Sequence, residues 1–547
     1  MKKVEEIISK YWFLIICLLS FPAIRALFVS GYFGASDDMH IAWLYEIDKI
    51  IKLGQIPPRF VPDLSFGFGY PLFNFVFPLP FYIGEIFHLL GLSFVDSIKA
   101  VFLISVPLSG IFMYLLLRQF VERNLSLIGA VLYIYTPYRS VDLYVRGAIG
   151  EIVGFVFLPL IILSAAKIFA KGNFKWIGIG ALSIASLVLS HNIAAYMFFP
   201  FVGFLLIIQF FLTPLKKEYI TKAFLMIFLG LLTSIYFWLP ALTESNLVKQ
   251  DTVFNFADHF PTLLQLIRPY WGYGASVPGP YDGMSFFLGI ANILLLFSGI
   301  CLFIFRWKQI SIQRKVFIGW VLGVITVAIF LMNYRSTIIW NNFPFLAYFQ
   351  FPWRFLILTT FFIPLLLIIF DKIRINNLLL TILLLLIIIS SMSYFRPQDF
   401  LGRLDNYYLN RYIPTPAASK EYLQLQEEYL RLPKAAESRP DKNYPMVFPD
   451  SGIIKVNKRS DLDVVIESNS NVESLINLNK YYFPGWKAKI DGKKMDIWAG
   501  KPFGQISFSM PAGYHKAEIY FTETTFRSLL NFASLGAFLV SLVVLSL

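Results

Sequence analysis

Long apolar runs recur along the whole chain and are separated by short polar segments. An α-helix needs about 20 residues to cross roughly 30 Å of hydrocarbon, and within that length it satisfies its own backbone hydrogen bonds. The pattern therefore predicts an all-α polytopic membrane protein with about twelve transmembrane helices. We expect these helices near residues 11–30, 97–117, 125–138, 150–170, 174–190, 193–213, 221–242, 285–305, 315–332, 355–370, 376–394 and 527–547.

The pattern changes between residues 395 and 525, where the chain becomes polar and prolines such as Pro433 and Pro440 interrupt it. The second half of this region alternates apolar and polar residues, which is typical of strands with one buried face. Asp491-Gly492 favours a tight hairpin turn. The sequence thus predicts a small β-sandwich before the last helix. We expect its strands at 452–456, 462–467, 474–478, 486–490, 505–509 and 516–521.

Composition and charge narrow the class of protein. Hydrophobic residues make up 57% of the 547 residues and charged residues 15%, which excludes an ordinary soluble protein. The net charge of +13 resides mainly in short loops, so it indicates orientation in a membrane and no nucleic-acid partner. Because basic loops face the cytoplasm, we expect a multi-pass plasma-membrane protein with both termini inside. The basic clusters lie at Lys2/Lys3/Lys10, Arg118/Arg123, Lys167/Lys171/Lys175, Lys216/Lys217/Lys222, Arg306/Lys308/Arg314/Lys315 and Lys372/Arg374.

The segment Tyr70–Leu90 is also apolar enough to span, but a span there would place every later basic cluster outside. Pro71, Pro78 and Pro80 near its start favour an interfacial or re-entrant helix instead. The predicted organisation is a transmembrane domain at 1–394 with a first outer loop at about 31–96, an extracytoplasmic domain at 395–525, and a last transmembrane helix at 526–547.

Two adjacent carboxylates and an imidazole, Asp37, Asp38 and His40, follow the first predicted helix directly. A carboxylate at the membrane surface can take a proton from an acceptor hydroxyl of a lipid-borne substrate, and the histidine could orient it or hold a metal. The alternative is an Asp N-cap on the helix that begins near Met39. The sequence alone leaves both interpretations open.

Further polar residues fall on the same predicted outer side. Arg59 suits a phosphate because its guanidinium donates in a fork, although an interfacial anchor would look the same. Arg146 and Glu151 enter the fourth helix, where Glu151 is a candidate acid, base or ligand, or simply the partner of Arg146. His191 and Asn192 lie at the outer end of the fifth helix.

Several of these groups are metal-ligand types. Asp38, His40, Glu151 and His191 could together hold a divalent cation, Mg²⁺ or Mn²⁺. The two cysteines, Cys17 and Cys301, lie inside apolar runs and predict no disulfide or metal–thiolate site.

Three motifs resemble a known family: Gly67-Phe-Gly69-Tyr70-Pro71 with the following Pro78-Leu-Pro80 stretch, the stretch from Tyr144 through Arg146 to Glu151, and Phe349-Gln350-Phe351-Pro352-Trp353-Arg354-Phe355. The chain resembles the bacterial and archaeal membrane proteins labelled 6-pyruvoyl-tetrahydropterin synthase-related, which are similar to the YfhO family. Both resemble the GT-C glycosyltransferase superfamily. The segment Tyr481–Gly492 is similar to the outer β domain of the YfhO type.

The resemblance implies transfer of a sugar from a polyprenyl-phosphate-linked donor to an envelope glycan, lipid or protein at the outer face, with an Asp of the first outer loop as base. Asp37 or Asp38 fills that position. Two alternatives remain: a transporter or flippase for lipid-linked saccharide, and a non-catalytic scaffold whose outer domain binds glycans or proteins. The residues expected around the substrate are His40, Arg59, Tyr144, Arg146, Glu151, His191, Asn192, Trp353 and Arg354.

Overall fold

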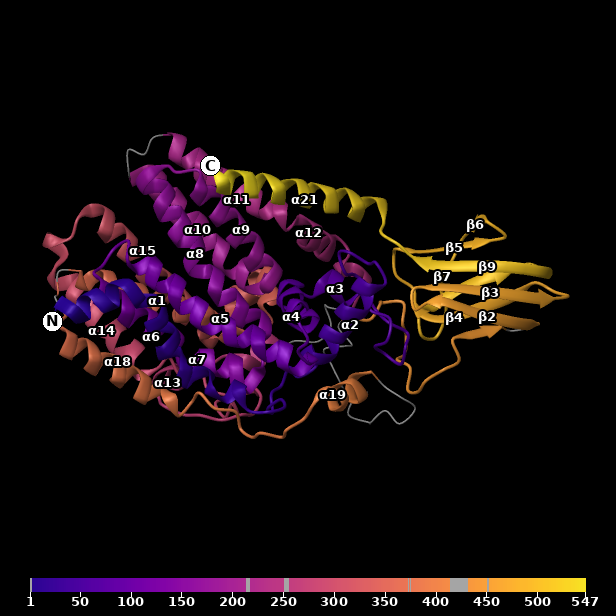
Figure 1. Cartoon of the computed structure of the whole chain (residues 1–547), viewed down its shortest axis with the longest axis horizontal. Coiled ribbons are helices and arrows are strands. Elements are labelled where there is room, and N and C mark those ends of the chain that lie inside the picture. The colour runs from indigo at the N-terminus through magenta and orange to yellow at the C-terminus, as the bar shows by residue number, and fades with distance from the viewer. Residues whose placement is uncertain are drawn as a thin grey trace.

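The computed structural model describes residues 2–212, 217–249, 255–371, 373, 375–413, 431–449 and 452–547. A helical body occupies one end of the elongated molecule and a β-sandwich the other, with α21 (Thr525–Ser546) lying along the body (Figure 1). Three basic residues used to predict orientation, Lys216, Lys372 and Arg374, lie outside the described residues. The 414–430 part of the predicted outer domain does so too.

Six segments of the described chain are long and apolar enough to cross a membrane. Protein covers 94% of the apolar window of Pro352–Phe370 but only 17% of that of Thr525–Ser546, so the first is central and the second peripheral. The six are Lys10–Phe28, from α1 (Lys2–Ile24) and η1 (Arg25–Phe28), α5 (Phe94–Leu117), Ile149–Ala170 of α8 (Ile149–Lys171), α15 (Ile312–Met332), Pro352–Phe370, from η8 (Pro352–Phe355), α17 (Leu356–Phe362) and η9 (Ile363–Phe370), and α21.

The other predicted spans also contain helices, but these are shorter or bent. The pair α11 (Lys217–Thr233) and α12 (Ile235–Thr243) is bent by 67°. A 16-residue helix such as α14 is about 24 Å long, less than the roughly 30 Å of hydrocarbon. Twelve helical segments are thus present where the sequence predicts them, whereas twelve membrane crossings stay a prediction. The shorter apolar helices are α6 (Arg123–Ile134), α9 (Lys175–Ser190), the segment Asn192–Ile208 of α10 (Asn192–Leu212), α14 (Ile290–Phe305) and α18 (Asn377–Met392).

The segment at about 31–96, which we call the first outer loop after its predicted side of the membrane, folds into short helices: α2 (His40–Lys52), α3 (Leu72–Phe75) and α4 (Leu79–Leu89). With 11 residues, α4 is about 16 Å long and too short to cross the bilayer. The interfacial or re-entrant placement of Tyr70–Leu90 stays a prediction. Elsewhere the short helices include α7 (Pro137–Ser140), the π-helical turn η2 (Val141–Arg146), α13 (Leu263–Ile267), α16 (Thr337–Asn342) and α19 (Asp405–Tyr412).

Two antiparallel sheets form the predicted sandwich. One has the strand order β1-β4-β8-β7 and the other β2-β3-β9-β5-β6. All six predicted strands are present, and Asp491 and Gly492, both with positive φ, close the β5–β6 hairpin. Prediction missed β1, β6 and β7, which are too short to show alternation. The strands are β1 (Val447–Pro449), β2 (Ile453–Ser460), β3 (Asp463–Ser470), β4 (Ser474–Tyr481), β5 (Trp486–Ile490), β6 (Lys493–Met495), β7 (Trp498–Ala499), β8 (Gln505–Met510) and β9 (Gly513–Phe521).

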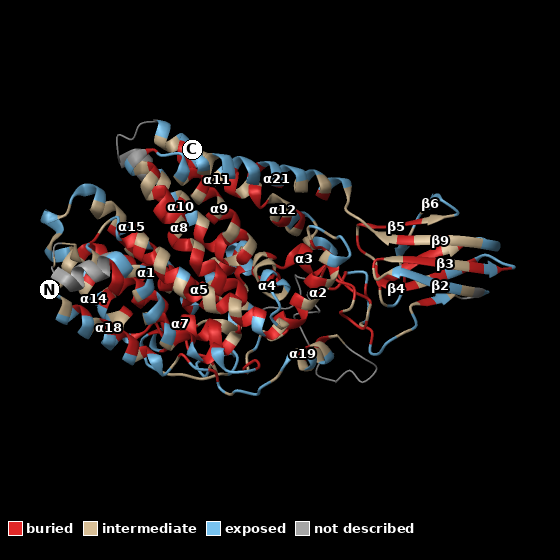
Figure 2. Cartoon of the chain, viewed as in Figure 1, coloured by how far each residue is buried: buried red, intermediate tan, exposed pale blue. Residues whose placement is uncertain are grey.

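The helical body and the sandwich have separate hydrophobic cores that meet at the first outer loop (Figure 2). Phe60 and Phe75 of that loop belong to the sandwich core. The buried ammonium of Lys480, on β4, donates to the carbonyl oxygens of Pro62 (2.9 Å) and Gly67 (2.7 Å). The first outer loop therefore lies between the membrane helices and the sandwich and contacts both.

Candidate active site

A left-handed glycine sets the geometry of the candidate site. The turn η2 ends at Gly147, whose φ of +72° lets the chain reverse into α8. A Cβ on Gly147 would lie 3.1 Å from the Ala35 side chain, so the glycine also permits close approach of the first outer loop. The loop is held there by backbone hydrogen bonds from Ser36 N to Val145 O (3.0 Å) and from Asp37 N to Arg146 O (2.7 Å). The aspartate pair thus lies beside the start of α8.

The Glu151 carboxylate, in the first turn of α8, lies at the centre of a buried polar cluster. Arg146 Nη1 is 2.8 Å from Glu151 Oε1 and 2.6 Å from Asp142 Oδ1. The Tyr138 hydroxyl donates to Glu151 Oε2 at 2.7 Å. Because Asp142 and Glu151 are buried, this is an enclosed network, unlike the surface ion pair weighed from the sequence.

Two more elements converge on the same carboxylate. His191, between α9 and α10, has its Nε2 3.7 Å from Glu151 Oε1, and Arg354 of η8 has its Nε 3.9 Å away. Both distances exceed a direct hydrogen bond. The Arg146 guanidinium carbon lies 4.8 Å from the centroid of the Trp353 ring. The structure therefore brings together Arg146, Glu151, His191, Trp353 and Arg354, which come from three distant parts of the sequence.

The contacts of His191 fix its protonation pattern. Its Nδ1 accepts the backbone N–H of Ala194 at 3.0 Å, so the neutral ring carries its proton on Nε2, the atom nearer Glu151. An imidazole in this state can donate to an anion. It is not set up to bind a cation through Nε2.

Asp38 lies in a second cluster, on the side of α19. The hydroxyl of Tyr412 donates to Asp38 Oδ1. Burial raises the pKa of the Asp38 carboxyl above its usual value, while Tyr412 and the nearby Arg411 and Arg403 oppose that rise. Helix α2 begins at His40 with Met39 as N-cap and no side-chain cap bond, so the structure gives no support to the Asp cap considered from the sequence.

Two of the expected residues, His40 and Tyr144, make contacts away from the Glu151 cluster. His40 packs edge-on against Trp43 and Phe81, with ring centroids 5.2 and 5.6 Å away. The Tyr144 hydroxyl donates to Ala23 O at 2.7 Å inside the core. Asn192 is the first residue of α10 and adjoins His191 in the chain.

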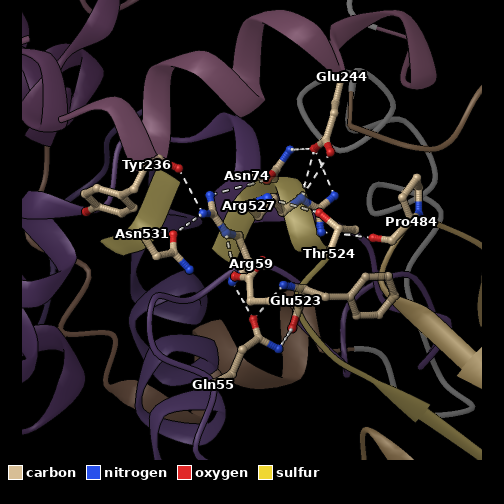
Figure 3. A network of polar contacts seen from close by, with 11 residues as sticks. Gln55, Arg59, Asn74, Tyr236, Glu244, Pro484, Glu523, Thr524, Arg527 and Asn531 are labelled. Atoms are coloured by element: carbon tan, nitrogen blue, oxygen red, sulfur yellow. Dashed lines mark hydrogen bonds and ion pairs between the residues drawn. The ribbon is translucent and has the colours of Figure 1, made fainter. Parts of the chain in front are cut away.

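Arg59 belongs to a different network, drawn in Figure 3. Its guanidinium donates to Glu523 Oε1 (3.0 Å), Asn531 Oδ1 (3.0 Å), Tyr236 O (2.8 Å) and Asn74 Oδ1 (3.4 Å). No contact given for the described residues links Arg59 to Arg146 or Glu151. Its contacts are with protein groups that join the first outer loop to α12 and α21.

A second arginine completes this network, which we call the clamp (Gln55, Arg59, Asn74, Tyr236, Glu244, Pro484, Glu523, Thr524, Arg527 and Asn531). Arg527 grips the Glu244 carboxylate with Nε (3.1 Å) and Nη2 (2.8 Å) and donates to Pro484 O at 2.9 Å. Asn74 also donates to Glu244 at 2.7 Å (Figure 3). The clamp therefore ties the start of α21 to the end of α12 and to the sandwich.

The residues expected to hold a divalent cation do not fit one. Both oxygens of Glu151 accept bonds from Arg146 and Tyr138, and His191 directs a proton toward the cluster. His40 packs against aromatic rings, and Asp38 accepts from Tyr412. Within the described part of the chain, no group of three His, Cys, Asp or Glu side chains could hold a metal ion.

Three residues that contact the candidate site, Tyr138, Asp142 and Tyr412, were not among the residues expected around the substrate. Asp142 and Arg146 are four residues apart, so helical spacing could have revealed their pairing. Tyr138 is a buried hydroxyl in an apolar run and carries no such signal. Tyr412 reaches Asp38 across 374 residues, which no local pattern can show.

No protein-family model matches the chain. Over 206 residues the chain is 27% identical to an uncharacterised protein of Lactococcus lactis subsp. cremoris (strain MG1363), covering 36% of this chain and 34% of that protein. The chain thus matches about a third of the length of that curated relative. The resemblance to the 6-pyruvoyl-tetrahydropterin synthase-related and YfhO proteins stays a prediction.

Among solved structures, the chain is similar to the arabinofuranosyltransferase AftD from mycobacteria, with a TM-score of 0.48 and 13% identity, covering 73% of this chain and 28% of that one. It is also similar to the Archaeoglobus fulgidus oligosaccharyltransferase in the apo form, with a TM-score of 0.44 and 12% identity, covering 80% of this chain and 62% of that one. Because both TM-scores are below 0.5, the chemistry must be inferred from the residues of the site.

Proposed function

We propose that this protein is a GT-C-type membrane glycosyltransferase that transfers a sugar from a polyprenyl-phosphate-linked donor to an envelope acceptor at the extracytoplasmic face. The observation that carries the proposal is the convergence of two guanidinium groups, Arg146 and Arg354, on Glu151 beside the Asp37 segment. These groups lie where α8 and the η8–α17–η9 run begin, at the ends of two candidate spans. A lipid-borne phosphate lies at that depth.

The reaction needs a base on one side and positive charge on the other. The acceptor oxygen forms a bond to the anomeric carbon while the bond from that carbon to the phosphate oxygen breaks with its electron pair. The acceptor proton passes to an aspartate carboxylate. Negative charge grows on the departing phosphate, and fixed cations in an enclosed site stabilise it. Arg354 and Arg146 are placed to supply this stabilisation.

We assign the base to Asp37. The backbone N–H of Asp37 donates to Arg146 O, and the Asp37 carboxylate interacts electrostatically with the Arg146 guanidinium. Asp37 therefore lies on the side of the loop that faces the Glu151 cluster. Asp38 accepts a hydrogen bond from Tyr412 and lies near Arg411, on the side of α19. In this proposal Asp38 positions the first outer loop, while Asp37 takes the proton.

The remaining residues of the cluster orient these groups. Glu151 pairs directly with Arg146 and lies 3.9 Å from Arg354. Its negative charge therefore holds the two positive guanidinium groups close to each other. The Trp353 ring packs against the Arg146 guanidinium, and His191 offers an Nε2 proton to an anion. The Arg59 contacts are with protein oxygens, so we leave Arg59 out of the proposed site.

A transfer assay tests the proposal. Purified protein in detergent is incubated with radiolabelled polyprenyl-phosphate sugars and an envelope extract, and the label is followed from donor to acceptor. We expect transfer by the natural protein and by Asp496→Asn, which removes an exposed carboxylate of the sandwich, and none by Asp37→Asn. Donor that stays intact with every sugar tested would contradict the proposal.

One observation favours the alternative of a transporter or flippase. The bent pair α11 and α12 breaks by 67° at Ser234, and broken helices are common at transporter binding sites. Reconstituted vesicles that move a fluorescent lipid-linked saccharide between leaflets, without breaking its glycosidic bond, would establish this alternative. The outcome is separable from the transfer assay because no label leaves the lipid.

A further inference from the structure

A cavity lies at the end of the helical body, and none of the residues that line it belongs to the Glu151 cluster. It opens where three apolar elements meet: α14 ends at Phe305, α15 begins at Ile312, and η9 ends at Phe370. The cavity has a volume of about 220 Å³, and isoleucines form part of its wall. Figure 1 places α14 and the N-terminus at the end of the molecule opposite the sandwich. The cavity therefore lies at a boundary of the apolar region.

The polar lining of the cavity carries net positive charge. Arg314 Nη1 pairs with Asp371 Oδ2 at 2.5 Å, while the Arg306 guanidinium donates from Nη1 to Ile369 O at 3.5 Å. Gln309 and Ser311 add an amide and a hydroxyl to the lining. Two guanidinium groups and one carboxylate leave a single positive charge, which matches one phosphodiester.

Exposed apolar residues and a lysine adjoin in sequence the segments that line the cavity, and we call these residues its rim. Phe305 is 83% exposed, and Ile304 and Ile312 are also exposed on either side of the loop. The Lys315 ammonium lies 4.7 Å from the Trp307 ring centroid. Tryptophan and lysine beside exposed aliphatic side chains are typical of the interface between water and hydrocarbon. A ligand of this site would meet apolar surface outside and cations inside.

We propose that this cavity binds the head group of an anionic phospholipid. The phosphodiester would lie between the guanidinium groups of Arg306 and Arg314, and its acyl chains would lie along the exposed apolar rim. The first turn of α15 adds backbone N–H groups, since its N-cap, Ser311, makes no side-chain cap bond. The basic loop is also the side that charge distribution assigns to the cytoplasm, whose leaflet carries anionic lipid. This site is independent of the proposed sugar transfer.

Native mass spectrometry of the full chain in detergent tests the proposal. Dioleoylphosphatidylglycerol and dioleoylphosphatidylcholine are titrated separately. We expect the anionic phosphatidylglycerol to bind about fivefold more tightly, which is the gain in affinity that one basic residue near an anionic lipid typically provides. Millimolar inorganic phosphate is the second arm and should not displace the bound lipid. Equal affinities for the two lipids would refute the proposal, and displacement by phosphate would make this a free-anion site.

Three variants separate the cavity from general surface charge. Arg306→Gln should lower phosphatidylglycerol affinity about fivefold. Lys175→Gln removes one exposed positive charge at the start of α9, on the predicted cytoplasmic side but outside the cavity lining, and should change the affinity little. Asp371→Asn frees Arg314 and should raise the affinity, a gain that a folding defect cannot produce. Equal losses in the two charge-removing variants, or a loss in Asp371→Asn, would overturn the proposal.

Discussion

Two buried arginine–carboxylate networks, the Glu151 cluster and the clamp, are built from similar residues but differ in the contacts of their arginines. In the clamp, Arg59 and Arg527 each donate from all three guanidinium nitrogens to protein oxygens. In the Glu151 cluster, His191 and Arg354 lie 3.7 and 3.9 Å from the central carboxylate.

Unpaired atoms occur in both networks. Among the described residues, the buried atoms Asp142 Oδ2 and Trp353 Nε1 of the Glu151 cluster have no hydrogen-bond partner, and neither has Glu523 Oε2 of the clamp. The two networks therefore differ in the contacts of their arginines, and the unpaired atoms do not separate them. The comparison teaches that a paired arginine network holds segments together, whereas a looser one leaves room for a substrate. The predictions below test this division, from the largest expected effect to the smallest.

The clamp should dominate stability. Arg527→Gln leaves the Glu244 carboxylate without its bidentate partner, and we expect a loss of about 3–5 kcal/mol in the free energy of unfolding. Donor binding by the folded protein should stay unchanged, because the two networks share no described contact. Denaturant titration in detergent measures the first quantity, with Lys494→Gln, an exposed strand residue, as control. A stable variant with weakened donor binding would reverse the assignment.

The two aspartates should differ in their effect on turnover. Asp37→Asn removes the proposed base, so we expect turnover to fall about 100-fold or more with little change in unfolding. Asp38→Asn should lose less, because in our proposal it acts on the loop and not on the proton. Initial rates of label transfer and thermal unfolding, measured for both variants, show which aspartate acts in turnover and which in stability. A greater loss in Asp38→Asn would exchange the two roles.

Arginine-to-lysine substitutions compare the two networks directly. Arg354→Lys keeps the charge but loses the planar fork, so donor binding should weaken by about 1–3 kcal/mol. Arg59→Lys is the matched control, since its contacts are with protein, and the folded protein should bind donor normally. Titration of a polyprenyl-phosphate analogue against both variants measures the difference. If Arg354→Lys bound like the natural protein, Arg354 would be an interfacial anchor only.

Sequence periodicity predicted the elements of this fold because it is a local property. Each of the twelve predicted apolar segments contains a helix, and the six longer alternating segments are strands. Periodicity alone could not predict which of these helices cross the membrane, because α9 and α14 are shorter than a membrane span. It also could not find β7, which has two residues. The parts that escaped prediction are those whose length or pairing depends on the rest of the chain.

The candidate site was predictable only in part. Arg146 and Glu151 are neighbours in sequence, and their ion pair follows from the start of a helix. His191 and Arg354 converge on Glu151 through the packing of separate helices. The sequence grouped His191 with Glu151 by residue type and predicted side of the membrane, and a family motif contains Arg354, but neither pattern gives the contacts. The enclosure of Arg59 had no signal, because an arginine in a predicted loop looks exposed. Tertiary packing decides such cases, and one sequence does not display it.

The smallest effect should come from removing the Tyr412 hydroxyl. The direction in which the activity–pH profile then moves shows whether Asp37 or Asp38 is the base. The hydrogen bond from Tyr412 lowers the pKa of the Asp38 carboxyl against the rise caused by burial. Tyr412→Phe removes that bond, so the pKa of Asp38 rises further, while the lost bond itself is worth about 1 kcal/mol. If Asp38 had to be ionised as the base, the acid limb of the activity–pH profile would move to higher pH. Because we assign the base to Asp37, we expect that limb to stay in place while the rate falls slightly at every pH. Profiles of transfer rate against pH for the two proteins measure this, and an upward shift of the acid limb would make Asp38 the base.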